Sequence, residues 1–211
     1  MELNNFSFYK GVFKGRAMAE QFIKPTGDKK KLLLHSCCAP CSTACIEALI
    51  NYFSVTVFYY NPNITEFNEY EKRKSEQIRL IKEHYSTVQF IEGNYNPQEF
   101  FSVAKNLEKE REGGKRCEKC IELRLKKTLE TAQELGFDVF CSTLSVSPHK
   151  NAKFINETGK TLAKNSKVKY LETDFKKNGG FLRSVELSKN YGLYRQNFCG
   201  CIYSELYGKN N

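Results

Sequence analysis

Short apolar runs alternate with amphipathic stretches along the chain from about residue 32 onward. The runs with the length of buried strands are LLLHS (32–36), VTVFYY (55–60), VQFIEG (88–93), FDVFCST (137–143) and VKYLET (168–173). Apolar residues recur at helical spacing between them, and we expect helices over about 40–52, 66–85, 97–110, 117–135, 151–164 and 181–190. Strands that alternate with helices predict an α/β domain built around a mostly parallel sheet.

Polar motifs follow three of the predicted strands. HSCCAPC follows the first strand, NPN (61–63) the second and STLSVSPHK the fourth. The carboxyl ends of parallel strands meet at one edge of a sheet, where ligands bind. We therefore expect these loops to form a functional site, in which Asn61 and Asn63 are candidates for contacts with a bound substrate.

Length and composition fit one globular domain with an additional N-terminal segment. The 211 residues, of which 40% are hydrophobic, are enough for one domain with its own core. We interpret residues 1–30 as an N-terminal extension with a short helix near Arg16–Ile23, and residues 31–211 as a single α/β domain. No apolar run approaches the roughly 20 residues of a membrane helix, and the first residues contain no secretory apolar region. We expect a cytoplasmic protein without a membrane partner.

Seven of the nine cysteines fall in three compact motifs. The motifs are CCAPC with Cys37, Cys38 and Cys41, CEKC with Cys117 and Cys120, and CGC with Cys199 and Cys201. In a reducing compartment, grouped cysteines are more often metal ligands or redox groups than structural disulfides. Cys45 and Cys141 lie in segments that we expect to be buried, and we interpret them as core residues.

Two of the motifs together offer the four thiolates that a [4Fe–4S] cluster takes. They are the Cys37–Cys38 pair after the first strand and the CxxC of Cys117 and Cys120, which opens a helix. Both pairs are expected at helix N-termini, where the helix dipole favours the thiolate. CxxC pairs are also common zinc ligands, so the spacing alone leaves a zinc site open. Cys41 is a candidate for a spare ligand, for a ligand of a second metal or for a catalytic thiol.

The CxC motif of Cys199 and Cys201 has a different character. Cysteines this close can form only a small, strained disulfide ring, which is easily reduced. Gly200 between them permits the tight backbone that such a ring requires. The pair therefore suits redox exchange, and a further pair of metal ligands is the alternative.

The chain is basic, with 33 Lys and Arg against 24 Asp and Glu and a net charge of +9. This excess suits a polyanionic partner such as nucleic acid, although a solvated lysine-rich surface has the same composition. Arg183 and Arg195 lie among tyrosines and further lysines, a mixture that can hold phosphates and stack on bases. His149 and Lys150 follow the fourth strand and are further candidates for substrate binding.

The motifs taken together resemble a known family. The segments that carry the resemblance lie between about Leu32 and Ser204 and are HSCCAPCS, FYYNPNI, KRCEKCIELRL, STLSVSPHKN, DFKKNGG and YGLYRQNFCGCIYS. They are similar to the cluster-dependent epoxyqueuosine reductases, which are unrelated to the cobalamin-dependent enzyme of the same activity. The resemblance implies a Rossmann-like three-layer fold similar to adenine-nucleotide α-hydrolase-like domains. Many of those bind ATP with a glycine-serine loop at the place where this chain has CCAPCS.

The resemblance also implies an activity and a site. The activity is the two-electron deoxygenation of epoxyqueuosine to queuosine at the wobble position of a tRNA with a GUN anticodon, the last step of queuosine modification. The implied site residues are Cys37, Cys38, Cys117 and Cys120 for a [4Fe–4S] cluster, and Cys199 and Cys201 for a redox-active disulfide.

The chemistry adds further expectations. A second iron or other metal ion near Cys41, or an iron of the cluster, would polarise the epoxide oxygen. Asp174 and His149 are candidates for the general acid by motif position, and the sequence does not identify the electron donor. Two rival functions stay open: a zinc-stabilised tRNA-binding module without redox activity, and an ATP-dependent tRNA-thiolating enzyme on a related fold.

Overall fold

The computed structural model of the chain describes residues 29–207. The helix expected near Arg16–Ile23 and nearly all of the expected extension lie outside the described residues, so the division at residue 30 stays a prediction. The strands are β1 (Lys30–Ser36), β2 (Phe53–Tyr59), β3 (Gln89–Glu92), β4 (Val139–Ser142) and β5 (Lys169–Tyr170). They form one five-stranded sheet in the order β3-β2-β1-β4-β5, and every neighbouring pair is parallel. The expected parallel α/β fold is confirmed.

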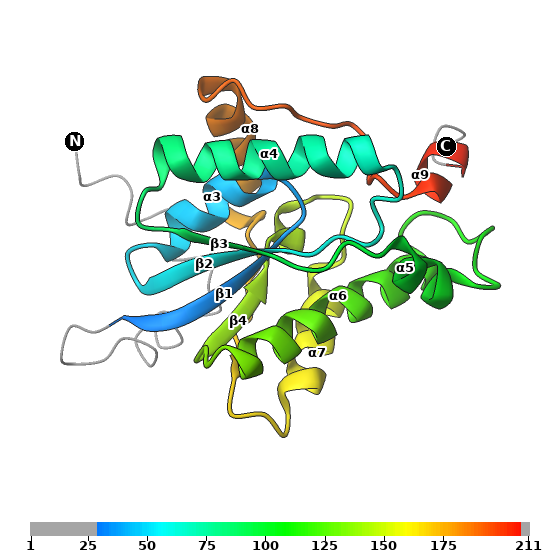
Figure 1. The fold of residues 1–211 in the computed structure, drawn as a ribbon, viewed down its shortest axis with the longest axis horizontal. Coiled ribbons are helices and arrows are strands. Elements are labelled where there is room, and N and C mark those ends of the chain that lie inside the picture. The colour runs from blue at the N-terminus through cyan, green and yellow to red at the C-terminus, as the bar shows by residue number, and fades with distance from the viewer. Residues whose placement is uncertain (1–28, 208–211) are drawn as a thin grey trace.

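Helices cover both faces of the sheet, which gives the molecule three layers (Figure 1). On one face lie α3 (Ala39–Leu49), α4 (Phe67–His84) and α8 (Gly180–Asn190), and on the other lie α6 (Lys115–Glu134) and α7 (Ala152–Ala163). α5 (Pro97–Ala104) packs on α6, and α9 (Ile202–Tyr207) follows the CxC motif. None of the helices within residues 29–207 has the length and apolar character that a membrane crossing requires.

The sequence of β1 explains why it occupies the centre of the sheet. Leu32, Leu33 and Leu34 are fully buried, which is possible only for a strand covered on both faces. Because successive side chains point to opposite faces, Leu32 and Leu34 join the core under α3 and α4, and Leu33 joins the core under α6 and α7.

Several element boundaries differ from the sequence-based expectation. The helix expected over 97–110 ends at Ala104, and Asn106 and Gly113 have positive φ angles in the turns that follow. The strand expected over 137–143 ends at Ser142, whose hydroxyl accepts a hydrogen bond from the Leu144 amide and starts the 3₁₀ turn η1 (Thr143–Val146). The strand expected over 168–173 has only two residues, because the Thr173 amide donates to the Asn156 side chain of α7 instead of to a strand.

The strand order reverses between β1 and β4, and this reversal positions the site. At such a switch point, chain connections leave the two strands in opposite directions and open a crevice at their carboxyl ends. His35 near the end of β1 ties this edge together, because its ring nitrogens hydrogen-bond to Ser142 Oγ (2.8 Å) and to the Tyr60 carbonyl oxygen (3.1 Å). Burial lowers the pKa of His35 to about 3, so the imidazole is neutral. The loops after β1, β2 and β4 therefore end at one fixed edge.

A close helix-to-strand approach gives a stability prediction. Gly159 of α7 lies against the ring of Tyr170, and a Cβ at this position would overlap that ring. Tyr170 is buried, and its hydroxyl donates to Asn156 Oδ1 (3.1 Å), which limits how far the ring can move. We expect Gly159→Ala to lower the free energy of unfolding by about 1–3 kcal/mol, the usual range for an overpacked core.

Urea denaturation of both proteins measures this difference. Lys153→Ala on the exposed side of α7 is the matched control, because the Lys153 side chain is 84% exposed and its replacement should change stability by less than about 0.5 kcal/mol. Equal midpoints for wild type and Gly159→Ala would mean that the Tyr170 ring relaxes without cost.

Candidate metal centre and redox site

The CCAPC motif brings three sulfur atoms together at the end of β1. Cys37 and Cys38 follow the strand directly, and Pro40 lies in the first turn of α3, where its missing N–H is not needed. That turn carries Cys41 back toward the strand end, so that the Sγ atoms of Cys37, Cys38 and Cys41 all lie within 4.8 Å of one another. Among the cysteine, histidine and carboxylate side chains of the described residues, these three form the group whose ligand atoms lie close enough together to hold a metal ion.

Hydrogen bonds among these three sulfurs shift the pKa values of the thiols in opposite directions. The side chains of Cys38 and Cys41 hydrogen-bond to Cys37 and hold the pKa of the Cys37 thiol well below its usual range. The same bond to Cys37 raises the pKa of Cys38 to about 12, and the pKa of Cys41 rises for the corresponding reason. One thiolate is thus shared by three sulfurs, and a second would need a cation. A soft metal ion bound by these sulfurs would supply that cation, because it binds thiolates in preference to thiols.

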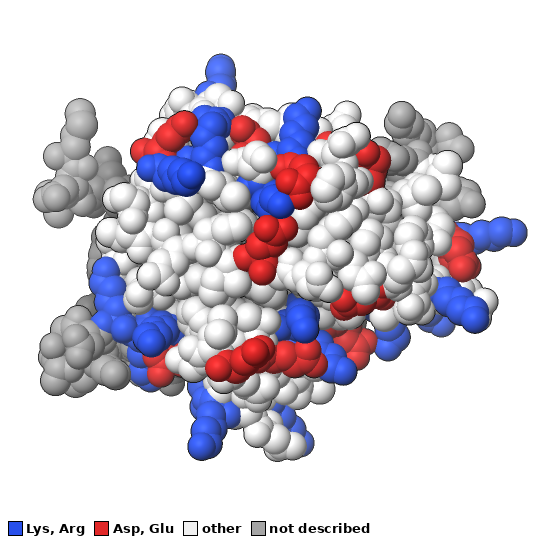
Figure 2. All heavy atoms as spheres, viewed as in Figure 1, with Lys and Arg blue, Asp and Glu red and all other residues white. Residues whose placement is uncertain are grey.

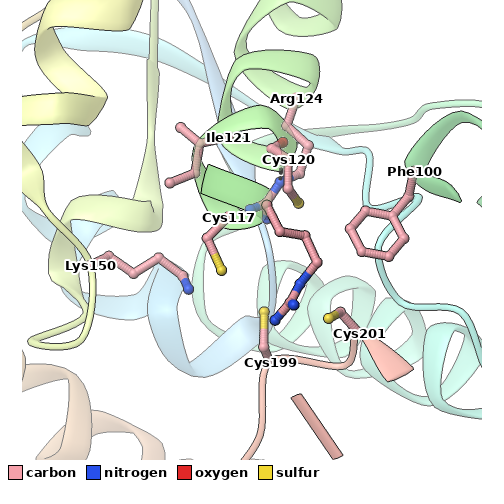
Figure 3. Close-up of a pocket in the computed structure, with 9 residues that line it drawn as sticks. Phe100, Cys117, Cys120, Ile121, Arg124, Lys150, Cys199 and Cys201 are labelled. Carbon is pink, nitrogen blue, oxygen red and sulfur yellow. Dashed lines mark hydrogen bonds between the residues drawn. The ribbon is translucent and has the colours of Figure 1, made fainter. Parts of the chain in front are cut away.

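The other two cysteine motifs meet in a cavity next to this group. Figure 3 shows Cys117 and Cys120 extending from the start of α6, Cys199 and Cys201 from the C-terminal segment, and Lys150 from the loop after η1, all into a common space. The remaining lining residues are Phe100, Arg116, Ile121 and Arg124. Helices in parallel α/β units begin at the carboxyl edge of the sheet, and this places the start of α6 beside the end of β1.

The helix start also explains the environment of the CxxC pair. α6 begins at Lys115, two residues before the expected Cys117, so both cysteines lie in its first two turns. The Gly113 amide donates to Cys117 Sγ (3.3 Å), and the helix dipole favours negative charge there. Burial raises the pKa of Cys120.

Arg124 connects the two groups of cysteines. It lies one turn after Cys120 on α6, is 2% exposed, and donates from Nε to the Cys120 carbonyl oxygen (3.2 Å). Its charge interacts with the thiols of Cys120, Cys199, Cys37 and Cys117, and these interactions raise its pKa against the opposing effect of burial. The two pairs expected to hold a cluster therefore lie within electrostatic reach of one guanidinium group. Soft cysteine sulfurs from two helix starts, beside a buried cation, are a ligand set that suits an iron–sulfur cluster.

The two cysteines of the CxC motif have different surroundings. Cys201 is 5% exposed and packs with Phe100 and Cys120, and burial raises its pKa to about 12. Cys199 is half-buried and accepts a hydrogen bond from Asn63 Nδ2 at 3.9 Å. The charge of Cys199 is also the largest cause of the raised pKa of Lys150. Both cysteines are free thiols in this structure.

The asparagines of the NPN loop lie where the sequence placed them, at the same edge. Asn61 Nδ2 donates to the Ser36 carbonyl oxygen (2.9 Å), which fixes the loop after β2 to the loop after β1. Both Asn61 and Asn63 are buried, and the Oδ1 atom of each has no hydrogen-bond partner among residues 29–207. Buried acceptors without partners are rare, and they are available to a bound group that carries hydrogen-bond donors.

The structure separates the basic candidates. Lys150 lines the cavity, whereas His149 beside it is exposed. Arg183 forms a two-point ion pair with Glu47 (3.0 and 2.8 Å) and a further contact with Glu186 (3.0 Å). Arg195 is exposed and lies over the Phe181 ring.

The two candidates for the general acid lie outside the residues that line the cavity. His149 is the first, and Asp174 is the second, which pairs with Lys176 at 2.9 Å. Cys45 and Cys141 are fully buried, as expected of core residues.

Sequence reasoning missed two buried arginines that border the site, Arg73 and Arg124. Both interrupt the buried face of a helix, since Arg124 follows Ile121 and precedes Leu125, and Arg73 follows Tyr70. A charged residue inside an apolar stripe is the signal that would have found them, because a buried charge requires partners. Gln77 and Gln196 were missed as well. Gln77 accepts hydrogen bonds from Ser36 and Ser42 beside Cys38, and Gln196 hydrogen-bonds to Cys38 itself.

The fold and the site define a class: a parallel α/β protein with a thiol-rich centre at its strand-order reversal. Comparison with known proteins makes this specific. The family model described as "Epoxyqueuosine reductase QueH" matches residues 32–206. The chain is similar to a Streptococcus pyogenes protein of that name, with 44% identity over 180 residues that cover 83% of this chain and 71% of the relative. A Staphylococcus epidermidis protein of the same name is 41% identical, over 85% of this chain and 78% of the relative. A Thermotoga maritima protein of that name is 37% identical, over 83% of this chain and 90% of the relative. The chain belongs to the QueH family.

Proposed function

We propose that this protein reduces epoxyqueuosine to queuosine at the wobble position of tRNAs with a GUN anticodon. The observation that carries the proposal is the meeting of three cysteine motifs at one sheet edge in a chain of the QueH family. The substrate is a cytoplasmic RNA, and we place the enzyme in that compartment.

The reaction requires two electrons and two protons. Both C–O bonds of the epoxide break, a C=C bond forms, and the oxygen leaves as water. Oxidation of the Cys199 and Cys201 thiols to a disulfide releases two electrons and two protons, so one turnover balances. An external donor then reduces the disulfide before the next turnover.

We assign a [4Fe–4S] cluster to Cys37, Cys38, Cys117 and Cys120. When bound, it would supply single-electron transfer, and a second iron or other metal ion near Cys41 would supply Lewis acidity. The protein's own residues prepare the site for the substrate. The partnerless oxygens of Asn61 and Asn63 accept hydrogen bonds from the substrate, and the Lys150 ammonium stabilises the charge that develops on the departing oxygen.

The activity test is an anaerobic incubation of the iron-loaded protein with epoxyqueuosine-containing tRNA and a chemical reductant. Mass spectrometry of the digested tRNA should show epoxyqueuosine replaced by a nucleoside that lacks one oxygen. Unchanged epoxyqueuosine under these conditions would contradict the proposal.

A zinc-stabilised tRNA-binding module is the second candidate, because the close grouping of Cys37, Cys38 and Cys41 suits a single ion. Metal analysis after anaerobic purification separates the two functions. Iron with acid-labile sulfide supports the reductase, and zinc without sulfide supports the binding module.

Binding of the tRNA should depend steeply on salt, because cationic side chains release counterions from the phosphates. The net charge of +9 is not gathered in one patch on the face seen in Figure 2, where basic and acidic side chains are intermixed. Arg195 is exposed and contacts only neutral groups in the described residues, the Phe181 ring and the Ser188 hydroxyl, so its charge is available to a phosphate. We expect Arg195→Ala to weaken binding and reduce the log–log salt slope by about 1. Arg183→Ala is the comparison and should change the slope less, since Glu47 and Glu186 already neutralise Arg183. Filter binding across a salt series measures both, and a flat salt response would contradict a role for the basic surface.

A further inference from the structure

The C-terminal segment that carries the CxC motif is fastened to α4 by a buried arginine. Arg73 is 2% exposed, although it belongs to a helix whose outer face meets solvent. Its Nη1 donates to the Cys199 carbonyl oxygen (3.0 Å) and its Nη2 to the Phe198 carbonyl oxygen (3.4 Å). The guanidinium carbon also lies 5.0 Å from the centre of the Phe198 ring, as in a cation–π contact. All of these contacts fall on or next to the redox pair.

Glu69 completes the attachment from one turn earlier on α4. It forms an ion pair with Arg73 Nε, which neutralises the buried charge and fixes the plane of the guanidinium. The Tyr194 hydroxyl donates to the same carboxylate (3.1 Å), so Glu69 also holds the segment that leads to the CxC motif. A planar guanidinium can serve three acceptors at once, which a lysine ammonium on a flexible stem cannot do in the same geometry.

The backbone of the CxC motif is shaped to fit this arginine. Gly200 has a φ of +95°, in a region that L side chains rarely adopt. A Cβ on Gly200 would lie 3.1 Å from both Nη1 and Nη2 of Arg73 and equally close to Ile64. The Thr65 amide donates to the Gly200 carbonyl oxygen (3.2 Å) on the other side. The loop therefore lies directly against the guanidinium, with no space for a side chain between them.

We propose that Arg73 is a positioning residue for the CxC pair, fixing the 198–200 backbone so that Cys199 faces Asn63 and Lys150 while Cys201 packs against Phe100 and Cys120. The proposal rests on the proposed function, in which this pair delivers the electrons. This role explains why α4 buries the ion pair of Arg73 and Glu69. Without these contacts, the two thiols would be held in place only by an irregular segment that belongs to no strand.

The test measures how fast each thiol of the reduced holoenzyme reacts with N-ethylmaleimide, resolved by peptide mass spectrometry. Local opening must precede the labelling of buried Cys201, and two hydrogen bonds from a charged donor oppose that opening. Arg73→Ala should therefore label Cys201 at least about tenfold faster than wild type. Arg73→Lys should also be faster, because it keeps the charge but loses the fork. Gly200→Ala disturbs the same contact from the opposite side and should give the same acceleration.

Arg79→Ala is the matched control. Arg79 lies on the same helix, pairs with Glu76, and donates to the carbonyl oxygens of Tyr191 (3.3 Å) and Gly192 (3.1 Å), farther from the CxC motif. Its replacement should leave the labelling of Cys201 unchanged. Thermal melting and iron content show that each variant is folded and loaded. If Arg73→Ala does not fold, Arg73→Lys and Gly200→Ala carry the test.

The outcomes distinguish this proposal from the proposed function. Wild-type labelling rates in folded Arg73 and Gly200 variants overturn the positioning role, even if Cys199→Ser abolishes turnover. An equal acceleration in Arg79→Ala also overturns it, since the effect would then belong to the whole segment. Accelerated labelling confined to the Arg73 and Gly200 variants, together with full turnover in Cys199→Ser, supports the attachment and overturns the redox role of the pair.

Discussion

Anaerobically purified wild-type protein should carry about four irons and a similar amount of acid-labile sulfide per chain, and Cys117→Ala should lose both. The same loss is expected of Cys37→Ala, Cys38→Ala and Cys120→Ala. The physical reason is that removal of one thiolate leaves an iron of the proposed cluster without its protein ligand. Iron and sulfide assays, with the visible absorption spectrum, measure the outcome.

Two further cysteine variants sharpen this test. Cys45→Ala is the control, because Cys45 lies on the buried face of α3 in the hydrophobic core, and the variant should keep the wild-type iron content. Cys41→Ala should keep the cluster if Cys41 is a spare ligand or a ligand of a second metal. Loss of metal in Cys41→Ala with full retention in Cys117→Ala would replace the four-cysteine cluster by a single-ion site on the CCAPC motif.

Cys199→Ser and Cys201→Ser should retain the wild-type iron content but stop multiple turnover. A serine hydroxyl has nearly the shape of a thiol but cannot form a disulfide, so these variants lose the two-electron step and keep the fold. The pair follows the last strand of the sheet, and both cysteines line the cavity from a segment that is not part of the sheet. The measurement is the anaerobic assay on epoxyqueuosine-containing tRNA, with iron determined on the same samples.

The result can contradict the assignment in two ways. Loss of iron in either serine variant would make Cys199 and Cys201 metal ligands. Full multiple turnover in both would mean that electrons reach the epoxide without the CxC pair. Ser204→Ala is the structural control, since Ser204 lies one turn beyond the pair and bonds only to Glu112 through its side chain at 3.2 Å. It should keep both iron and activity.

The architecture was accessible from the sequence because its signals are local. LLLHS and VTVFYY are short apolar runs between helical stretches, and they form β1 and β2 as expected. The boundaries that were wrong depend on partners distant in the sequence. β5 is cut short by the Asn156 side chain of α7, and the helix after Pro97 ends where Asn106 adopts a positive φ angle. Neither cause is visible in the periodicity of the segment itself.

The site was predictable as a set of motifs but not as a geometry. Spacing identified the cysteines, and the parallel topology placed them at one edge. The grouping of Cys41 with Cys37 and Cys38 depends on how the first turn of α3 folds back on the strand end. Arg73 and Arg124 interrupt apolar helix faces, which is a visible signal, but the backbone carbonyl groups to which both donate carry no sequence signature and could not be named in advance. The two-point ion pair of Arg183 with Glu47 joins α8 to α3 across more than a hundred residues of chain.

The parallel sheet also divides the loops of this protein into two groups, one at each edge, that should differ in their tolerance of insertions. Every cysteine motif lies at the carboxyl edge, whereas the connections at 50–52, 85–88 and 135–138 lie at the opposite edge. Leu135 there is 49% exposed, and among the described residues no atom lies within 4 Å of the Cβ position of neighbouring Gly136, whose φ is +68°. Lengthening this turn would leave the distances among the thiols untouched. This turn is therefore a suitable place to insert an affinity tag or a reporter peptide, because the insertion point lies at the edge of the sheet opposite the thiols.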